Sequence, residues 1–365
     1  MPHIQALDTR VYRVPTDRPE ADGTFRWDSS TLVLVEAQAE SGQRGLGFSY
    51  CAAAAARVVH DQLAPVVVGC AVRDVRRAWD DMVAAVRNVG RGGIAACAIS
   101  AVDVALWDLA ARLDDRPLFV RLGPRRREVP IYGSGGFTSY TDRELADQLA
   151  GWVGQGIPRV KMKIGTEWGT QPEADVRRVR LAREAIGPEA ELFVDANGAY
   201  SVKQAIQLAA AFAQQGATYF EEPVSSDNLQ GLASVRQQIP QSVAAGEYGW
   251  DPWYFRQLLQ AQAVDILQAD ATRCLGITGW LEAASLAHAF GVPFSAHTSP
   301  SIHAHVGCAA PRLAHVEYFH DHVRIEHLLF DGVLEPVAGG LRPDPDRPGL
   351  GLELKAHDAE AWRIG

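Results

Sequence analysis

The spacing of hydrophobic and polar positions divides the chain into two parts with different periods. Residues 3–14 alternate loosely between apolar and polar side chains, which predicts a strand. Residues 15–29 are rich in Pro, Asp and Gly and indicate a loop, and the runs 31–40 and 45–50 predict a hairpin around Ser-Gly-Gln-Arg-Gly. From 52 to 122 the period becomes helical. We expect this front part to form an α+β unit over residues 1–125.

After residue 125 the pattern changes to short apolar runs that alternate with longer helical stretches. Eight runs predict strands, at 129–135, 159–165, 191–198, 218–223, 242–248, 265–270, 293–297 and 315–319. Alternating β and α elements with continuous apolar strands indicate a parallel sheet. Eight such units over residues 126–320 predict an α/β fold, a modified (β/α)8 TIM-type barrel behind an α+β N-terminal capping domain. We expect residues 321–365 to pack back on the capping domain.

Composition and charge exclude several classes of protein. The formal net charge is -9 and no long basic run occurs, so nucleic acid is not expected as a partner. No run approaches 18 uncharged apolar residues, and the N-terminus lacks the pattern of a signal peptide, so we expect no membrane segment. The five cysteines are scattered without a CxxC pair, which favours reduced thiols and a cytoplasmic protein.

Acidic side chains recur where the predicted barrel strands end. The spacings from Asp195 through the later strand ends are 26, 26, 23 and 27 residues, about one β/α unit each. Catalytic groups of a barrel lie at these carboxyl ends. Asp195, Glu221 and Glu247 end three adjacent strands, and their carboxylates would repel one another unless a hard cation lay among them. Oxygen ligands without Cys or His favour Mg²⁺, with Mn²⁺ as a possible substitute.

Two lysines occupy the strand before these carboxylates. Lys161 and Lys163 are separated by one residue, so both point into the barrel while Met162 faces the helices. Two neighbouring ammonium groups depress each other's pKa, which would make one of them a general base.

A histidine and two further acids end the last strands. Asp270 precedes His297 by one strand and is expected to hold the second nitrogen of its imidazole. Glu317 is expected to point inward beside His297 and, if protonated, to donate a hydrogen bond to a developing oxyanion. Lysine and histidine would then flank one carbon atom from two faces.

Several motifs resemble those of the mandelate racemase/muconate lactonizing enzyme subgroup of the enolase superfamily, over nearly the whole chain. The resemblance is carried by AISAVDVALWDLAARL (98–113), KMK (161–163), FVDANGAYS (193–201), FEEP (220–223), GEY (246–248), QAD (268–270), SAH (295–297) and VEY (316–318).

The resemblance implies a role for each of these residues. Asp195, Glu221 and Glu247 would hold the metal, and Lys163 and His297 would be bases. Lys161 would face the substrate carboxylate, Asp270 would support His297, and Glu317 would act as an acid toward that carboxylate. Asn197 and Glu222 would lie directly behind the ligands. The resemblance also implies a homo-oligomer, from a dimer to an octamer.

This site is what abstraction of a proton alpha to a carboxylate requires, by way of an enediolate. The favoured reaction is dehydration of a sugar acid, an aldonate or aldarate, to a 2-keto-3-deoxy acid. The alternative is racemisation or epimerisation of a 2-hydroxy acid by the same two bases, and cycloisomerisation is a third possibility. The substrate is a small carboxylate in each case.

Four aromatic residues and one arginine are candidates for contacts with the distal part of the substrate. Phe25, Arg26 and Trp27 would form a lid that excludes water, unless Phe25 and Trp27 only pack against the capping helices. Tyr50 and Tyr132 are further candidates for the lining of the mouth.

Overall fold

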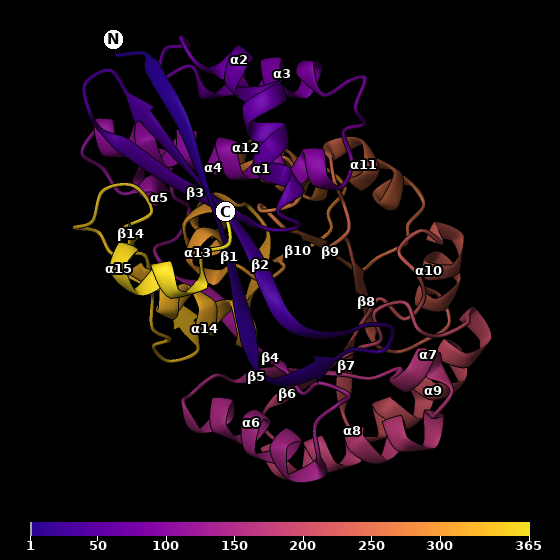
Figure 1. The fold of residues 1–365 in the computed structure, drawn as a ribbon. Helices are drawn as coiled ribbons and strands as arrows, with labels where there is room; N and C mark the ends of the chain where they lie inside the picture. Colours follow the sequence, from indigo (N-terminus) through magenta and orange to yellow (C-terminus); the bar gives the residue numbers. More distant parts are fainter. Residues whose placement is uncertain (1) are drawn as a thin grey trace.

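The computed structural model describes residues 2–365 and contains a capping domain over a closed barrel (Figure 1). The capping sheet is antiparallel, in the order β1 (Ile4–Ala21), β2 (Arg26–Ala39) and β3 (Arg44–Tyr50). Its helical elements are α1 (Ala54–Val58), the π-helical turn Val59–Leu63, α2 (Ala64–Val67), α3 (Val75–Ala85), α4 (Ile94–Leu113) and α5 (Leu118–Arg121).

The predicted loop at 15–29 is wrong, because most of it is strand. β1 and β2 form one long hairpin that crosses the barrel opening, with Glu20 opposite Trp27 and Ala21 opposite Arg26. The prolines of this stretch are tolerated because β1 is an edge strand, and the ladder is irregular between Pro15 and Glu20. The true turn is only 22–25, where the Asp22 carboxylate accepts hydrogen bonds from the backbone amides of Thr24 and Phe25.

The core of the capping domain is the helix α4. By length and composition this helix passes as a membrane span, but 89% of its apolar window is buried inside the protein, as in a core helix. Strand β3 approaches it closely. A Cβ at Gly47 would lie 2.2 Å from the carbonyl oxygen of Ala101, so only glycine fits there.

The second part is a closed parallel barrel, as predicted. Its eight strands are β4 (Val129–Gly135), β5 (Arg159–Lys163), β6 (Glu191–Asp195), β7 (Ala217–Glu221), β8 (Ser242–Ala245), β9 (Ile266–Ala269), β10 (Phe294–Ala296) and β11 (Leu313–Phe319). Pairing between β11 and β4 closes the ring. The connecting helices are α6 (Asp142–Gly154), α7 (Thr166–Gly169), α8 (Pro172–Ile186), α9 (Val202–Gln214), α10 (Leu229–Arg236), α11 (Pro252–Gln260), α12 (Gly276–Ala289) and α13 (Pro300–Ala309). Strands β8, β9 and β10 end one or more residues earlier than predicted. Glu247, Asp270 and His297 therefore lie in the loops that follow these strands, at the mouth of the barrel.

The last part of the chain contacts both domains. Helix α14 (His320–Leu329) follows β11, and β13 (Gly340–Leu341) pairs with the barrel strand β4. Strands β12 (Phe330–Asp331) and β14 (Glu353–Leu354) pair with each other, before α15 (Ala356–Ala359) and a 3-10 turn (Glu360–Trp362). The C-terminus lies along β1, where the amide of Ile364 donates to the Val11 carbonyl at 2.8 Å.

Asp108 on α4 forms hydrogen bonds both to the capping sheet and to the C-terminal segment. Its buried carboxylate accepts hydrogen bonds from the backbone amides of Leu46 (2.7 Å) and Leu350 (2.6 Å) and from Arg112 Nε (2.8 Å). We expect Asp108→Ala to lower the free energy of unfolding by about 2–6 kcal/mol, because two buried amides lose their partner at about 1–3 kcal/mol each. Urea unfolding measures this, with the exposed Asp80→Ala on α3 as the control. A loss below 1 kcal/mol for Asp108→Ala would show that the carboxylate is dispensable.

Buried His305 on α13 makes stability depend on pH. Burial lowers the pKa of His305 from 6.5 to about 4, and its Nδ1 accepts a hydrogen bond from the amide of Phe119 at 3.2 Å. The stabilisation of the folded state by neutral His305 is therefore present above pH 6.5. It is lost as the pH falls toward 4, since the histidine of the unfolded chain binds its proton at a higher pH. We expect His305→Gln to reduce the loss of unfolding free energy between pH 7.5 and 4.5 by about 2–3 kcal/mol. Equal pH slopes in urea titrations of both proteins would contradict this assignment.

Candidate active site

Three buried carboxylates converge at the carboxyl ends of β6, β7 and β8. Asp195 ends β6, Glu221 ends β7 opposite it in register, and Glu247 follows β8. One oxygen of each lies within 4.8 Å of the others. Glu247 is aimed inward by the turn at Gly246, where φ is 136° and a Cβ would lie 2.0 Å from the Gln268 carbonyl oxygen. The parallel register therefore builds the predicted cluster of acidic ligands.

This cluster fits a hard divalent cation. The three side chains are at most 3% exposed and offer only oxygen atoms, as Mg²⁺ prefers. Glu247 Oε2 is buried without a hydrogen-bond partner, although His297 Nε2 lies 3.3 Å away. Burial and the charge of Asp195 raise the pKa of Glu221 well above its usual range, so the cluster favours added positive charge.

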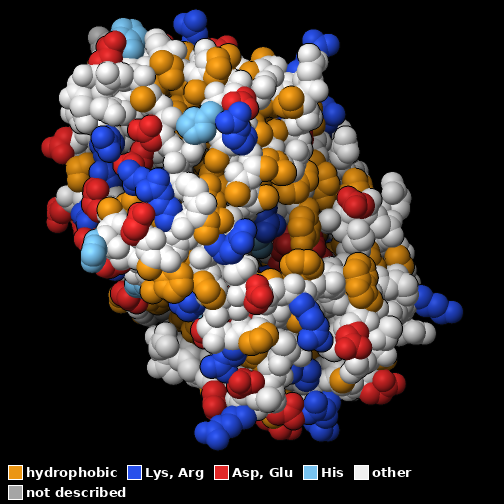
Figure 2. Space-filling view, in the orientation of Figure 1, with side chains coloured by type: hydrophobic (Ala, Val, Ile, Leu, Met, Phe, Trp, Pro, Cys, Tyr) orange, Lys and Arg blue, Asp and Glu red, His pale blue; other side chains and the backbone are white. Residues whose placement is uncertain are grey.

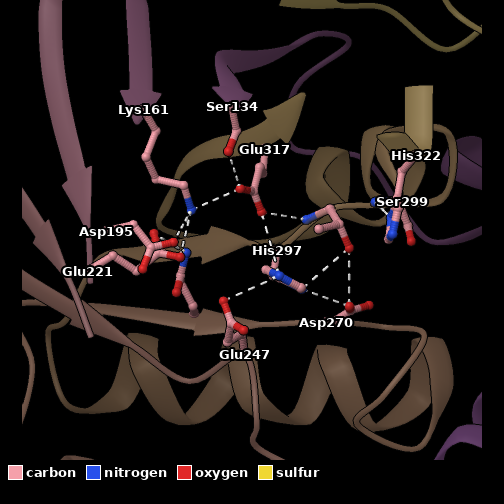
Figure 3. Close-up of polar contacts among 12 residues, drawn as sticks. Ser134, Lys161, Asp195, Glu221, Glu247, Asp270, His297, Ser299, Glu317 and His322 are labelled. Carbon is pink, nitrogen blue, oxygen red and sulfur yellow. Dashed lines mark hydrogen bonds and ion pairs between the residues drawn. The ribbon is translucent and has the colours of Figure 1, made fainter. Parts of the chain in front are cut away.

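The lysines of β5 supply part of that charge. Lys161 Nζ lies 2.6 Å from Glu221, 2.8 Å from Glu317 and 3.3 Å from Asp195, and Lys163 Nζ lies 2.5 Å from Asp195 Oδ2 (Figure 3). Both side chains point into the barrel as predicted, and both are buried.

The sequence predicted that Lys161 and Lys163 lower each other's pKa, and this prediction is wrong. Burial alone lowers the pKa of Lys163, but the Asp195, Glu247 and Glu221 carboxylates outweigh burial and the nearby Lys161, so the pKa is raised. The pKa of Lys161 is raised for the same kind of reason, chiefly by Glu221 and Glu317 against its burial. A cation bound among the carboxylates would neutralise their negative charge. The lysine pKa values would then fall, which favours a neutral amine.

His297 forms the predicted pair with Asp270. Its Nδ1 lies 2.9 Å from Asp270 Oδ2, which fixes the ring and leaves Nε2 facing the cavity. Thr298 Oγ1 also donates to Asp270 Oδ2 at 3.2 Å. Burial raises the pKa of Asp270, but His297 and Arg273 lower it more, so this carboxylate stays ionised beside the imidazole.

Glu317 lies between the lysine side and the histidine side of the site. It accepts hydrogen bonds from Ser134 Oγ (2.6 Å) and from the Thr298 amide (2.9 Å), and its Oε1 contacts Lys161. Burial raises the pKa of Glu317, but the positive charges of Lys161 and His297 lower it by a larger amount. The pKa of Glu317 therefore lies below the usual range of a glutamate. The sequence analysis expected Glu317 to donate a hydrogen bond if it is protonated; the lowered pKa makes the carboxylate the resting form, so Glu317 can act as an acid only after it takes up a proton.

Above these groups lies a cavity of about 520 Å³ between the capping hairpin and the barrel. Figure 2 shows a hollow in this face with charged side chains at its floor and hydrophobic side chains gathered beside it. Of the residues expected from the sequence, the cavity is lined by Phe25, Trp27, Tyr50, Lys163, Asn197, Glu247, His297 and Glu317. Lys161, Asp195 and Glu221 lie beneath this lining. Glu222 follows Glu221 and lines a neighbouring hollow instead.

Two of the expected lining residues lie elsewhere. Arg26 is exposed and points toward Glu167, with 3.8 Å between the charged groups, because it lies on the outer side of the hairpin. Tyr132 is fully buried one layer deeper in the barrel, with its ring 5.3 Å below Lys161 Nζ. Since barrel interiors are filled in layers, Tyr132 supports Lys161 rather than the mouth.

The lid aromatics contact the barrel side and their own hairpin. Trp27 packs edge-on against Phe137, with 5.5 Å between ring centroids. Its Nε1 donates to Glu20 (2.9 Å) and Asp321 (3.3 Å). Phe25 is stacked on Trp27 at 6.2 Å and is 66% exposed. The alternative that these rings only pack against capping helices is therefore wrong.

Sequence reasoning missed several residues of the cavity. Arg273 comes three residues after Asp270, and its guanidinium lies 3.7 Å from both Asp270 and Glu247 and 5.5 Å from the Tyr248 ring. Tyr248 directly follows the ligand Glu247, so its place in that motif was an available signal. His322 stacks on Tyr50 at 3.4 Å, but nothing in its local sequence marks it.

The fold and the site together define a class, namely barrel enzymes with a capping domain, three acidic ligands and a lysine and histidine on two sides. Residues 7–123 match the family model of the mandelate racemase/muconate lactonizing enzyme N-terminal domain, and residues 144–359 match the enolase C-terminal domain-like model. The chain therefore belongs to the mandelate racemase/muconate lactonizing enzyme family of the enolase superfamily.

Individual relatives cover the chain from end to end. D-galactarolactone cycloisomerase of Agrobacterium fabrum is 33% identical over 99% of both chains. A mandelate racemase/muconate lactonizing enzyme-like protein from Rubrobacter xylanophilus is 52% identical, with a TM-score of 0.96 and full coverage of both chains. L-talarate/galactarate dehydratase of Salmonella typhimurium LT2, solved with Mg and L-lyxarohydroxamate, has a TM-score of 0.90 at 27% identity and covers 100% of this chain and 93% of its own.

Proposed function

We propose that the protein abstracts the proton alpha to a carboxylate with the help of Mg²⁺, and that it dehydrates a sugar acid, an aldonate or aldarate, to a 2-keto-3-deoxy acid. The observation that carries the proposal is the placement of Lys163 and His297 in one cavity, on strands across the barrel, with the three carboxylates between them. Bound Mg²⁺ would supply the positive charge that acidifies the alpha proton of the substrate.

The chain's own residues account for the proton movements. Lys163 Nζ or His297 Nε2 takes the alpha proton, and Lys161 Nζ faces the negative charge that develops on the enediolate. Asp270 keeps the His297 imidazole oriented, with Nδ1 bound and Nε2 turned to the cavity. His297 as imidazolium then protonates the departing 3-hydroxyl, which leaves as water, and the enol tautomerises to the keto acid.

The polar character of the cavity supports a polyhydroxylated substrate. Besides the catalytic groups, hydroxyl and carboxylate side chains line it, and these are Asp22, Ser29, Ser30, Thr31, Thr298 and Asp321. Relatives that act on aldarates, such as the talarate/galactarate dehydratase, support the same class of substrate.

Racemisation or epimerisation of a 2-hydroxy acid is the second candidate. The presence of bases on two sides of the cavity favours it, since one can remove the proton and the other can return it to the opposite face. Cycloisomerisation through the same enediolate is a third candidate, which the similarity to a galactarolactone cycloisomerase supports.

The test is a screen of aldonates and aldarates with Mg²⁺-loaded enzyme, scored for 2-keto-3-deoxy acids. Formation of a keto acid from one stereochemical series supports dehydration and identifies the substrate. Absence of keto acid, together with inversion at C2 of a 2-hydroxy acid, would replace dehydration by racemisation.

We further propose that the protein works as a homo-oligomer in the cytoplasm.

A further inference from the structure

A second hollow of about 340 Å³ opens directly beside the active-site cavity. The two share Asn197 and Tyr248 as lining residues, so they adjoin each other at these two side chains. The loops after β5, β6, β7 and β8 build this annex, together with the tip of the capping hairpin at Thr24. The annex is used by none of the steps described above.

The inner wall of the annex carries polar atoms that have no partner. Glu222 is 1% exposed, and its Oε1 makes no hydrogen bond within the described part of the chain. Asn197 Oδ1 is also buried and unpartnered. Such atoms cost free energy unless a ligand or water satisfies them, so this wall is built to accept hydrogen bonds. Hydroxyl groups of Ser225 and Ser226 adjoin them.

The outer rim of the annex is aromatic. Trp168 is 66% exposed, and it and Glu167 both adopt left-handed backbone conformations, with φ of 59° and 50°. Two consecutive strained residues that present an exposed tryptophan indicate a functional constraint. The strain is held in place by the lid, because the Trp168 amide donates to the Gly23 carbonyl at 2.8 Å.

The two other aromatic rings of the rim are fixed from behind. Tyr248 is 40% exposed and lies under the Arg273 guanidinium. The Trp250 ring lies beside the backbone of Gly92 in the capping domain, 3.5 Å from where a Cβ would stand. The annex is thus an aromatic shelf of Trp168, Tyr248 and Trp250, with hydrogen-bonding groups at its inner wall.

We propose that the annex is a subsite for a pyranose ring, so that the enzyme accepts a sugar acid that carries a glycosyl unit on a hydroxyl beyond the reacting carbons C2 and C3. This inference rests on the proposed function and narrows its substrate class. The apolar faces of a sugar ring stack on aromatic side chains, while its hydroxyls donate to carboxylate and amide oxygens such as those of Glu222 and Asn197. Because the annex adjoins the catalytic cavity at Asn197 and Tyr248, a ring bound there would lie beyond the reacting carbons.

Binding of glycosylated and simple acids tests the subsite without turnover. Calorimetry with the Mg²⁺-loaded enzyme compares gluconate with lactobionate, cellobionate and maltobionate, which all carry a hexose on the same gluconate unit. We expect at least one of the three to bind tenfold or more tightly than gluconate. Trp168→Ala should abolish that difference and leave the affinity for gluconate within twofold, while Trp168→Phe should retain most of it.

Three results would overturn the proposal. Either none of the disaccharide acids binds more tightly than gluconate, or Trp168→Ala weakens gluconate equally. Dissociation of an oligomer by Trp168→Ala in light scattering, with unchanged ligand affinities, would show instead that the shelf is a protein interface. Loss of the affinity difference in Trp168→Ala would support the subsite even if no keto acid is formed, so the subsite and the proposed reaction can fail separately.

Discussion

Replacement of His297 by asparagine is expected to lower kcat/KM for the dehydrated sugar acid by about 10²–10⁴-fold, the contribution of a positioned general acid or base. Asparagine keeps a polar side chain beside Asp270 but cannot exchange a proton with the substrate. The loss should fall mainly on kcat, because His297 acts on the alpha carbon and the leaving hydroxyl rather than on the carboxylate.

The matched control is His288→Asn, which changes an exposed histidine on α12 in the same barrel. It should retain full activity. Steady-state kinetics at saturating Mg²⁺ distinguish the two variants, and a His297→Asn enzyme within fivefold of the unaltered protein would remove His297 from the mechanism.

Glu221→Gln is expected to abolish the response of the protein to Mg²⁺. The substitution removes one of three converging carboxylates, while the single amide oxygen can still accept one of the two hydrogen bonds that Glu221 receives, from Lys161 or from Gln268. In the unaltered protein, Mg²⁺ at 100 times its Kd should raise the free energy of unfolding by about 2.7 kcal/mol, which appears as a rise in Tm of a few degrees.

The variant should show no such rise and no activity, and chelation of the unaltered protein should reproduce both losses until Mg²⁺ is returned. Glu189→Gln, at an exposed position before β6, is the control and should respond normally. A Tm increase of equal size in Glu221→Gln would place the cation elsewhere.

The positions of the candidate catalytic groups could be predicted from the sequence because a parallel barrel repeats one unit. Each strand delivers its last residues to the same level, so the spacing of Asp195, Glu221 and Glu247 along the chain already implied that they meet. The pairing of Asp270 with His297 followed from the same rule for the next two strands.

Features that depend on contacts between distant segments could not be predicted. The 15–29 stretch has the composition of a loop, yet its pairing with β2 makes it strand, and only that pairing shows that Arg26 faces away from the cavity. Tyr132 follows the inward alternation of β4, but its depth is set by its register opposite Glu317. The pKa values of the lysines depend on four carboxylates from other strands, which local sequence does not contain.

The most direct test of the proposed chemistry is conversion of the sugar acid in D₂O, followed by nuclear magnetic resonance. Dehydration through an enediolate predicts loss of the C2 proton and a 2-keto-3-deoxy acid with one deuterium at C3, formed about 10²–10⁴-fold more slowly by the His297→Asn enzyme. Deuterium at C2 with inversion and no keto acid would indicate a racemase or epimerase. If none of the aldonates, aldarates or 2-hydroxy acids loses its C2 proton to the Mg²⁺-loaded enzyme, the central claim of alpha-proton abstraction is contradicted.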